Sequence, residues 1–225
     1  MKAVPTLLTT SKHEFIVQIE RFQHYFDRIQ LDIADGKLVP NKTTQIQDMI
    51  ELITSDSIPI RPQVTFDFHL MVSDFEPEIK KIRSLQSQGL NVNAILVNAE
   101  KKPNIAELKR TYQFSIGLDI FPSTEIKAIA CDYNLSKIPQ IQIMTVNPGF
   151  QGSPFLSHML QKIEQLRTHY YTGEILIDGG VNSKTLPEIM KQKYQPDIVC
   201  IGSFLTKAGT NLGSRIKELK NLERS

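Results

Sequence analysis

Residues 30–41 read QLDIADGKLVPN and contain the end of a strand pattern followed by a turn. Apolar residues at positions 29, 31 and 33 alternate with polar ones, among them Asp32, and an Asp-Gly pair then turns the chain. In a protein built from alternating strands and helices, a carboxylate at the carboxyl end of a strand lies where active sites form. Asp32 is therefore either a catalytic residue or a hydrogen-bond partner of the following loop, and this stretch alone leaves both interpretations open.

The same strand pattern recurs along the chain, each time followed by a segment with helical periodicity. The expected strands lie at residues 3–8, 28–32, 64–71, 94–97, 115–121, 141–146, 174–178 and 197–203, and the expected helices at 12–26, 42–52, 78–85, 105–112, 124–130, 154–169, 183–193 and 211–221. No Gly/Ser-rich linker divides them. Eight such repeats in 225 residues favour a (β/α)8 barrel over a doubly wound sheet. We therefore expect an α/β protein with one TIM-barrel domain over residues 1–225.

Composition favours a small ligand over a polymer or a membrane. The chain has 26 Lys+Arg against 24 Asp+Glu without a block of either sign, so we expect no nucleic-acid partner. Its apolar runs are of strand length, and its first residues lack a cleavage-site pattern, so we expect no membrane segment and a cytoplasmic location. Cys131 and Cys200 are expected to be reduced thiols, with Cys200 buried in a strand.

A closed barrel would bring the carboxyl ends of all strands to one face. The residues expected there are Thr6, Asp32, His69, Asn98, Phe121, Met144, Asp178 and Ser203. Two opposed carboxylates can remove a proton from one face of a carbon and return it to the other. A single buried histidine is more often structural, but His69 beside Asp32 and Asp178 is also a set of metal ligands.

Glycines gather after the last three strands, in NPGFQGSPF, DGG and IGS. Glycine lets backbone N–H groups approach an anion closely, and the loops after strands seven and eight are the common phosphate site of such barrels. Three glycine loops at consecutive strand ends therefore predict that a phosphate group binds there.

With these residues in hand, the chain resembles the ribulose-phosphate 3-epimerases over almost its whole length. The matching stretches are LDIADGKLVPN, DFHLMV, MTVNPGFQGSPF, ILIDGGVNSKT and the final IGS. The resemblance implies that Asp32 and Asp178 exchange the C3 proton of D-ribulose 5-phosphate and D-xylulose 5-phosphate. It also implies that both aspartates and His69 bind a divalent metal, Zn, Fe(II) or Mn, which stabilises an enediolate.

The resemblance further implies the residues that contact the phosphorylated sugar. They are Thr6, His69, Met71, Met144, Gly149, Phe150, Gln151, Gly152, Gly179, Gly180, Gly202 and Ser203. Whether the barrel associates with itself is left open.

The chain departs from this family pattern in the half of the site that would hold the metal and the sugar. Gln30 replaces a histidine ligand, although its amide oxygen could still bind a metal weakly. Ala34 replaces a methionine, Asn98 a histidine, Phe121 an asparagine and Thr6 a serine, whereas the phosphate side is nearly intact. Two alternatives therefore stay open: an epimerase for another ketose phosphate, and a sugar-phosphate-binding homologue without catalysis.

The related decarboxylases and aldolases are a less favoured alternative. The decarboxylases carry Asp-x-Lys-x-x-Asp on a strand, with the lysine directed into the site. Ala34 occupies the place of that lysine, and Lys37 lies beyond the glycine turn.

Overall fold

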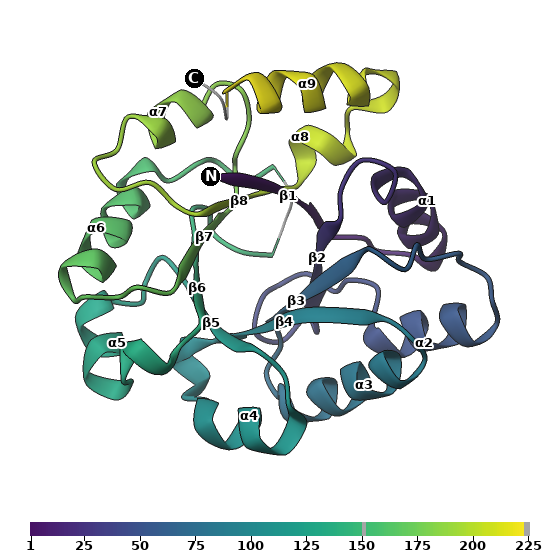
Figure 1. Ribbon diagram of the computed structural model, residues 1–225, viewed down its shortest axis with the longest axis horizontal. Coiled ribbons are helices and arrows are strands. Elements are labelled where there is room, and N and C mark those ends of the chain that lie inside the picture. The colour runs from purple at the N-terminus through teal and green to yellow at the C-terminus, as the bar shows by residue number, and fades with distance from the viewer. Residues whose placement is uncertain (150–151, 223–225) are drawn as a thin grey trace.

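A closed barrel of eight parallel strands forms the centre of the computed structural model, which describes residues 1–149 and 152–222 (Figure 1). Neighbouring strands in the sequence pair in order, and the first strand pairs with the last to close the barrel. The strands are β1 (Lys2–Leu7), β2 (Arg28–Ala34), β3 (Thr65–Met71), β4 (Asn91–Asn98), β5 (Ile116–Ile120), β6 (Gln140–Met144), β7 (Glu174–Asp178) and β8 (Ile198–Ile201). The predicted (β/α)8 fold is confirmed.

Helices form a ring outside the barrel, as Figure 1 shows in a view close to the barrel axis. They are α1 (Lys12–Phe22), α2 (Ile46–Thr54), α3 (Glu76–Ser87), α4 (Ile105–Tyr112), α5 (Ile126–Asp132), α6 (Gln161–Thr168), α7 (Leu186–Met190), α8 (Ser203–Thr206) and α9 (Leu212–Leu222). Short 3-10 turns lie at η1 (Ala99–Lys101), η2 (Leu135–Lys137), η3 (Ser157–Leu160) and η4 (Gly209–Asn211).

The strands are buried on both faces, as expected for a parallel sheet covered by helices. Outward residues of the strands, such as Ile29 and Phe68, pack against the helices in the main apolar core. A smaller apolar cluster fills the inside of the barrel and consists of Val4, Leu96, Leu176, Ile198 and Cys200. The side chains that point inward nearer the carboxyl ends of the strands are largely polar, and they form the floor of the site described below.

Several predicted boundaries were wrong. The helix expected over residues 42–52 begins only at Ile46, because Thr43 and Thr44 first donate backbone N–H groups to carbonyls of Ala34 and Thr9. The helix expected over residues 154–169 is a 3-10 turn followed by the shorter α6. Ser203, expected at the end of a strand, is instead the first residue of α8.

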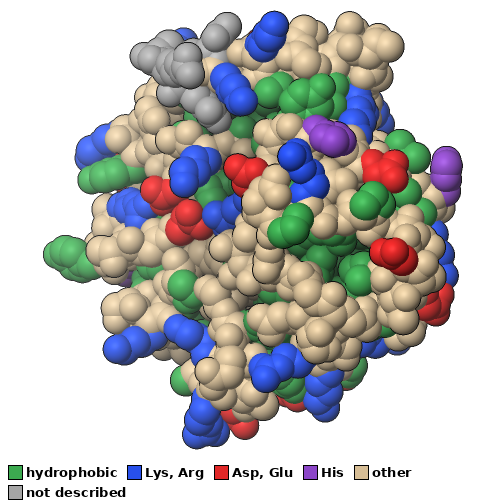
Figure 2. Space-filling view, turned by 45° about the vertical axis from the view of Figure 1, so that its right-hand side comes forward, with side chains coloured by type: hydrophobic (Ala, Val, Ile, Leu, Met, Phe, Trp, Pro, Cys, Tyr) green, Lys and Arg blue, Asp and Glu red, His purple; other side chains and the backbone are tan. Residues whose placement is uncertain are grey.

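On the face drawn in Figure 2, Lys and Arg side chains are more numerous than Asp and Glu, and both are scattered without forming one continuous patch. Within residues 1–149 and 152–222, no helix has the length and hydrophobicity needed to cross a bilayer.

Candidate active site

One cleft at the carboxyl ends of the strands brings together most of the residues singled out from the sequence. Its space outside the protein atoms is about 490 Å³, which includes open solvent at its mouth. The predicted residues that line it are Thr6, Asp32, Met71, Met144, Gly149, Gly152, Asp178, Gly179, Gly180, Gly202 and Ser203. Phe150 and Gln151 lie outside the described residues. His69 is fully buried and is not among the lining residues, so its expected contact with a sugar stays a prediction.

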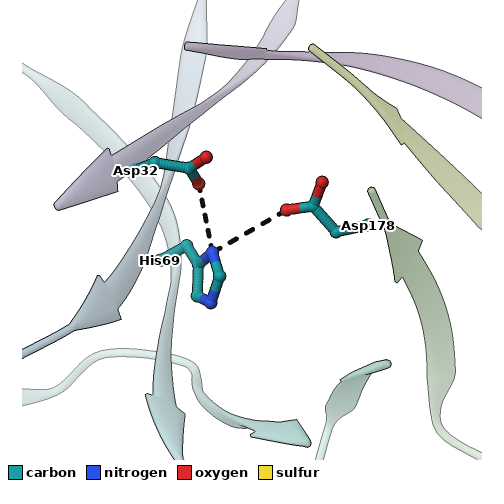
Figure 3. Close-up of side chains that lie close together, drawn as sticks. All are labelled: Asp32, His69 and Asp178. Atoms are coloured by element: carbon teal, nitrogen blue, oxygen red, sulfur yellow. Dashed lines mark hydrogen bonds and ion pairs between the residues drawn. The ribbon is translucent and has the colours of Figure 1, made fainter. Parts of the chain in front are cut away.

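Asp32, His69 and Asp178 form a compact buried cluster at the floor of this cleft (Figure 3). Nδ1 of His69 lies 3.1 Å from Oδ1 of Asp32 and 3.7 Å from Oδ2 of Asp178. One ligand atom from each residue lies within 4.8 Å of the other two. Two buried carboxylates this close repel each other unless a proton or a cation lies between them, and imidazole and carboxylate groups are ligands that divalent metals accept. The cluster can therefore hold a divalent metal ion.

Protons take the place of a cation in the metal-free cluster. Burial and the charge of Asp32 raise the pKa of Asp178 to about 8, against the opposing influence of His69 and Gln30. Burial lowers the pKa of His69, but the carboxylates of Asp119 and Asp32 outweigh it and leave this pKa well above its ordinary value. Because metal ligands must lose such protons, binding of a metal would be coupled to proton release.

Gln30 faces the cluster with its amide nitrogen rather than its oxygen. Nε2 of Gln30 donates to Oδ2 of Asp178 at 2.7 Å and to Oδ1 of Asp32 at 3.2 Å. Its oxygen accepts from the Cys200 thiol at 3.3 Å, and burial raises the pKa of that thiol, which keeps the donor hydrogen in place. In this arrangement Gln30 stabilises the two carboxylates and turns its amide oxygen away from them, and its role as a weak oxygen ligand stays a prediction.

Two polar residues beneath the cleft were missed in the sequence. Asp119 of β5 is fully buried, with Oδ2 lying 3.3 Å from Nε2 of His69. Gln142 of β6 is also fully buried and donates from Nε2 to Oδ2 of Asp178 at 3.0 Å. Both stand inside short apolar strands, IGLDI and QIQIM, where an isolated polar residue is the pattern that could have identified them.

The glycine loops after β6, β7 and β8 border one side of the cleft. At two positions in them, the surroundings require glycine. Gly179 and Gly180 both have positive φ angles, of 116° and 68°. A Cβ at Gly179 would collide with Val146, and one at Gly180 would lie 2.9 Å from Cβ of Phe155. Among the described lining residues none is Lys or Arg, so an anion here would be bound by backbone N–H groups and hydroxyls.

An apolar wall closes the remaining side of the mouth. It consists of Ala34, Val39, Met71, Phe121, Met144 and Val146. The loop after β2 contributes Val39 and is held by Asp35, whose carboxylate accepts from the Ser73 backbone N–H at 2.8 Å and from its hydroxyl at 2.6 Å. Phe121 and Ala34 therefore belong to one apolar surface, on the side where the sequence departs from the family pattern.

Comparison with known proteins identifies relatives of this chain. The model of the family described as "Ribulose-phosphate 3 epimerase family" matches residues 2–205. Ribulose-phosphate 3-epimerase of Helicobacter pylori (strain J99 / ATCC 700824) is 30% identical over 210 residues, which are 91% of this chain and 90% of the relative. The enzyme of the same name from Schizosaccharomyces pombe is 29% identical over 187 residues, or 82% of this chain and 78% of the relative.

Solved structures share the fold at much lower identity. The crystal structure of 3-hexulose-6-phosphate synthase from Salmonella typhimurium has a TM-score of 0.67 and 12% identity, covering 99% of this chain and 98% of that one. At this identity the likeness concerns the barrel alone.

Proposed function

Because the chain belongs to the ribulose-phosphate 3-epimerase family, we propose that it interconverts D-ribulose 5-phosphate and D-xylulose 5-phosphate by proton transfer at C3. Family membership makes it an epimerase, an enzyme of the isomerase class. The observation that carries the specific proposal is the pair Asp32 and Asp178, which come from β2 and β7 and line the same cleft.

Asp32 and Asp178 would act as paired base and acid on the two faces of C3. One carboxylate removes the proton, which is acidic because the adjacent carbonyl can accept the charge as an enediolate. The other returns a proton to the opposite face, which inverts the carbon. The amide N–H groups of Gln30 and Gln142 hold Oδ2 of Asp178 at 2.7 and 3.0 Å, so this carboxylate is fixed in orientation before substrate binds.

Asp32, His69 and Asp178 would hold the divalent metal, for which zinc, iron(II) and manganese all accept this donor set. Such an ion, when bound, supplies positive charge that stabilises the negative charge developing on the substrate oxygens.

The glycine loops would bind the phosphate group of the sugar. Gly149, Gly179 and Gly202 line the cleft from the loops after β6, β7 and β8, and Ser203, the first residue of α8, lines it beside them. The apolar wall would cover the sugar carbons on the other side. Thr6 adds a hydroxyl whose oxygen is buried and lacks a hydrogen-bond partner among the described residues.

Proton NMR of D-ribulose 5-phosphate in deuterated water tests the proposal. We expect the C3 proton signal to disappear while xylulose 5-phosphate accumulates, in samples supplied with zinc, manganese or iron(II). Asp178→Asn should lower the rate by about 10²–10⁴-fold, the usual contribution of one positioned acid or base. A folded protein that exchanges no proton with any of these metals would contradict the proposal.

The same experiment separates the two alternatives. Phe121 and Ala34 reshape the apolar wall and favour an epimerase for a different ketose phosphate, which would exchange the proton of a six-carbon ketose phosphate but not that of ribulose 5-phosphate. A sugar-phosphate-binding protein would bind both without exchange. We also propose a cytoplasmic location, in keeping with the two free thiols Cys131 and Cys200.

A further inference from the structure

Asp119 is a buried carboxylate with no role in the proton transfer proposed above. It lies on β5 beneath the cleft floor, and its side chain is fully buried. Oδ2 of Asp119 accepts from Nδ2 of Asn98 at 3.3 Å and lies 3.3 Å from Nε2 of His69. A carboxylate without solvent costs several kcal/mol to bury unless positive charge or donors compensate for it, so its position behind His69 requires a reason.

Asp119 and His69 are placed to form a hydrogen bond with each other. The 3.3 Å approach is within ion-pair distance, but its geometry does not make a hydrogen bond. Nε2 of His69 and Oδ1 of Asp119 are both buried and both lack a hydrogen-bond partner among the described residues. Buried polar atoms are rarely left in this state, and a proton on Nε2 would satisfy both groups after a small rotation of the ring.

On the other side of the ring, Nδ1 faces an amide and a carboxylate. Nε2 of Gln142 lies 3.2 Å from Nδ1 of His69, and an amide NH2 group can only donate. The orientation of the Gln142 amide is supported by its bond to Asp178 at 3.0 Å. A flipped amide would set its oxygen against the carboxylate of Asp178. Nδ1 also lies 3.1 Å from Oδ1 of Asp32, and this contact needs either a proton or a metal ion between the two atoms. When a metal ion takes that place, Nδ1 is the ligand atom and the one proton of the neutral ring is on Nε2, toward Asp119.

We propose that Asp119 is a positioning residue that holds His69 as the Nε2–H tautomer, so that the lone pair of Nδ1 faces Asp32 and Asp178 as a metal ligand. The inference rests on the metal site of the proposed function. A carboxylate behind a ligating imidazole fixes the ring and raises its basicity. Because Gln30 turns its amide oxygen away from the carboxylates here, the strength of the remaining imidazole ligand matters more in this chain than in a site with two histidines.

Competition with a chromophoric chelator for Zn²⁺ gives the first test. Asp119→Asn keeps the size of the side chain and removes its charge, and we expect Zn²⁺ affinity to fall about 10–100-fold, as for other outer partners of metal ligands. The matched control is Asp67→Asn. Asp67 is equally buried and lies on the same strand as His69, but it pairs with Arg28. The control should lose stability without losing Zn²⁺ affinity. A folded Asp119→Asn protein with wild-type affinity would overturn the proposal.

Nitrogen-15 NMR of the His69 ring in the wild-type protein gives a second test that needs no variant. The ring is recorded as the neutral imidazole, at alkaline pH without metal and again with Zn²⁺ bound. We expect a protonated Nε2 in both samples, and an Nδ1–H tautomer would overturn the proposal. A protein that binds no Zn²⁺ would contradict the metal part of the proposed function, while the tautomer in the metal-free sample would still decide the role of Asp119.

Discussion

Gln30 sets the character of the proposed metal site, because an amide takes the place where the family pattern has an imidazole. Its two N–H groups point at Asp32 and Asp178, at 3.2 and 2.7 Å. They offset part of the repulsion between the carboxylates, which a cation would otherwise have to offset alone. If the proposed metal site is correct, the exchange lowers both the number of ligands and the need for a metal.

Restoring the imidazole should therefore strengthen metal binding. We expect Gln30→His to raise Zn²⁺ affinity by roughly tenfold or more, since even residues outside the ligand set change affinity by about 10–100-fold. Gln30→Leu is the control, because it fills the same space without a ligand atom. Both are measured by chelator competition and by metal content after dialysis. Equal affinities for the two variants would show that position 30 does not face the metal.

The polar residues at the strand ends could be predicted from the sequence, but those further inside the barrel could not. Asp32 and Asp178 each precede a glycine turn, which makes them visible in the sequence. Asp119 and Gln142 lie within strands that are buried on both faces, where the apolar pattern does not distinguish an inward from an outward side chain. The direction of the Gln30 amide depends on Cys200, 170 positions away in the chain. Only closure of the barrel brings these groups together.

At the scale of elements, the apolar wall depends on a lysine of the neighbouring helix α6. Lys162 of α6 is buried, and its ammonium donates to the carbonyls of Phe121, Pro122 and Thr124 at 3.1, 3.0 and 2.7 Å. Glu100 of η1 accepts from the Thr124 hydroxyl at 2.7 Å. The segment between β5 and α5, which carries Phe121, is therefore held by α6 on one side and by η1 on the other.

We expect Lys162→Met to lower the free energy of unfolding by about 2–3 kcal/mol, because three carbonyls lose a charged donor, while relief of the ammonium's burial offsets part of the loss. Urea unfolding measures the change. Loosening of the wall should also raise KM more than it lowers kcat.

The control is Lys193→Met, which removes an exposed ion pair with Glu164 of the same α6 helix. This pair should contribute less than about 1 kcal/mol. If the two variants were equally stable, the bonds of Lys162 would not be holding the loop.

The order of the elements could be predicted from the sequence, but not all of their ends. Every predicted strand overlaps an observed one, because strands buried on both faces give continuous apolar runs. The start of α2 was missed because its cap is Gln45 with Asp48, a less common capping pair than Ser or Thr with Glu. The short α8 was also missed, since four residues carry too little periodicity to indicate a helix.

At the scale of the whole molecule, the barrel interior changes in character along its axis. At its amino end Arg28 pairs with Asp67 at 2.6 Å and with Glu174 at 3.2 Å. Apolar residues such as Leu96 and Leu176 fill the middle. At the carboxyl end His69 and several carboxylates are buried together. The first polar layer is internally paired, whereas the last needs a proton or a metal to balance its charges.

This imbalance predicts how stability depends on pH in the protein stripped of metal. Asp178 has a pKa of about 8 in the folded state against 3.8 as its ordinary value, so the folded state keeps a proton that the unfolded state has lost. The pKa of His69 is likewise raised above 6.5, against the effect of its burial, by Asp119 and Asp32. Stability from both groups is present at low pH and decreases as pH rises through their folded pKa values.

We therefore expect the urea midpoint of the chelator-treated protein to fall between pH 6 and 8.5. The free energy of unfolding should decrease by at most about 1.4 kcal/mol per pH unit for each proton involved. This window lies below the titration of Cys200 and above that of Asp35, whose pKa is lowered by hydrogen bonds from Ser73 despite its partial burial. Asp178→Asn should flatten the dependence. Zn²⁺ should oppose it, because a metal favours the deprotonated ligands, so that its stabilising effect grows with pH. A midpoint that rose with pH in the metal-free protein would mean that these carboxylates are paired by something other than protons.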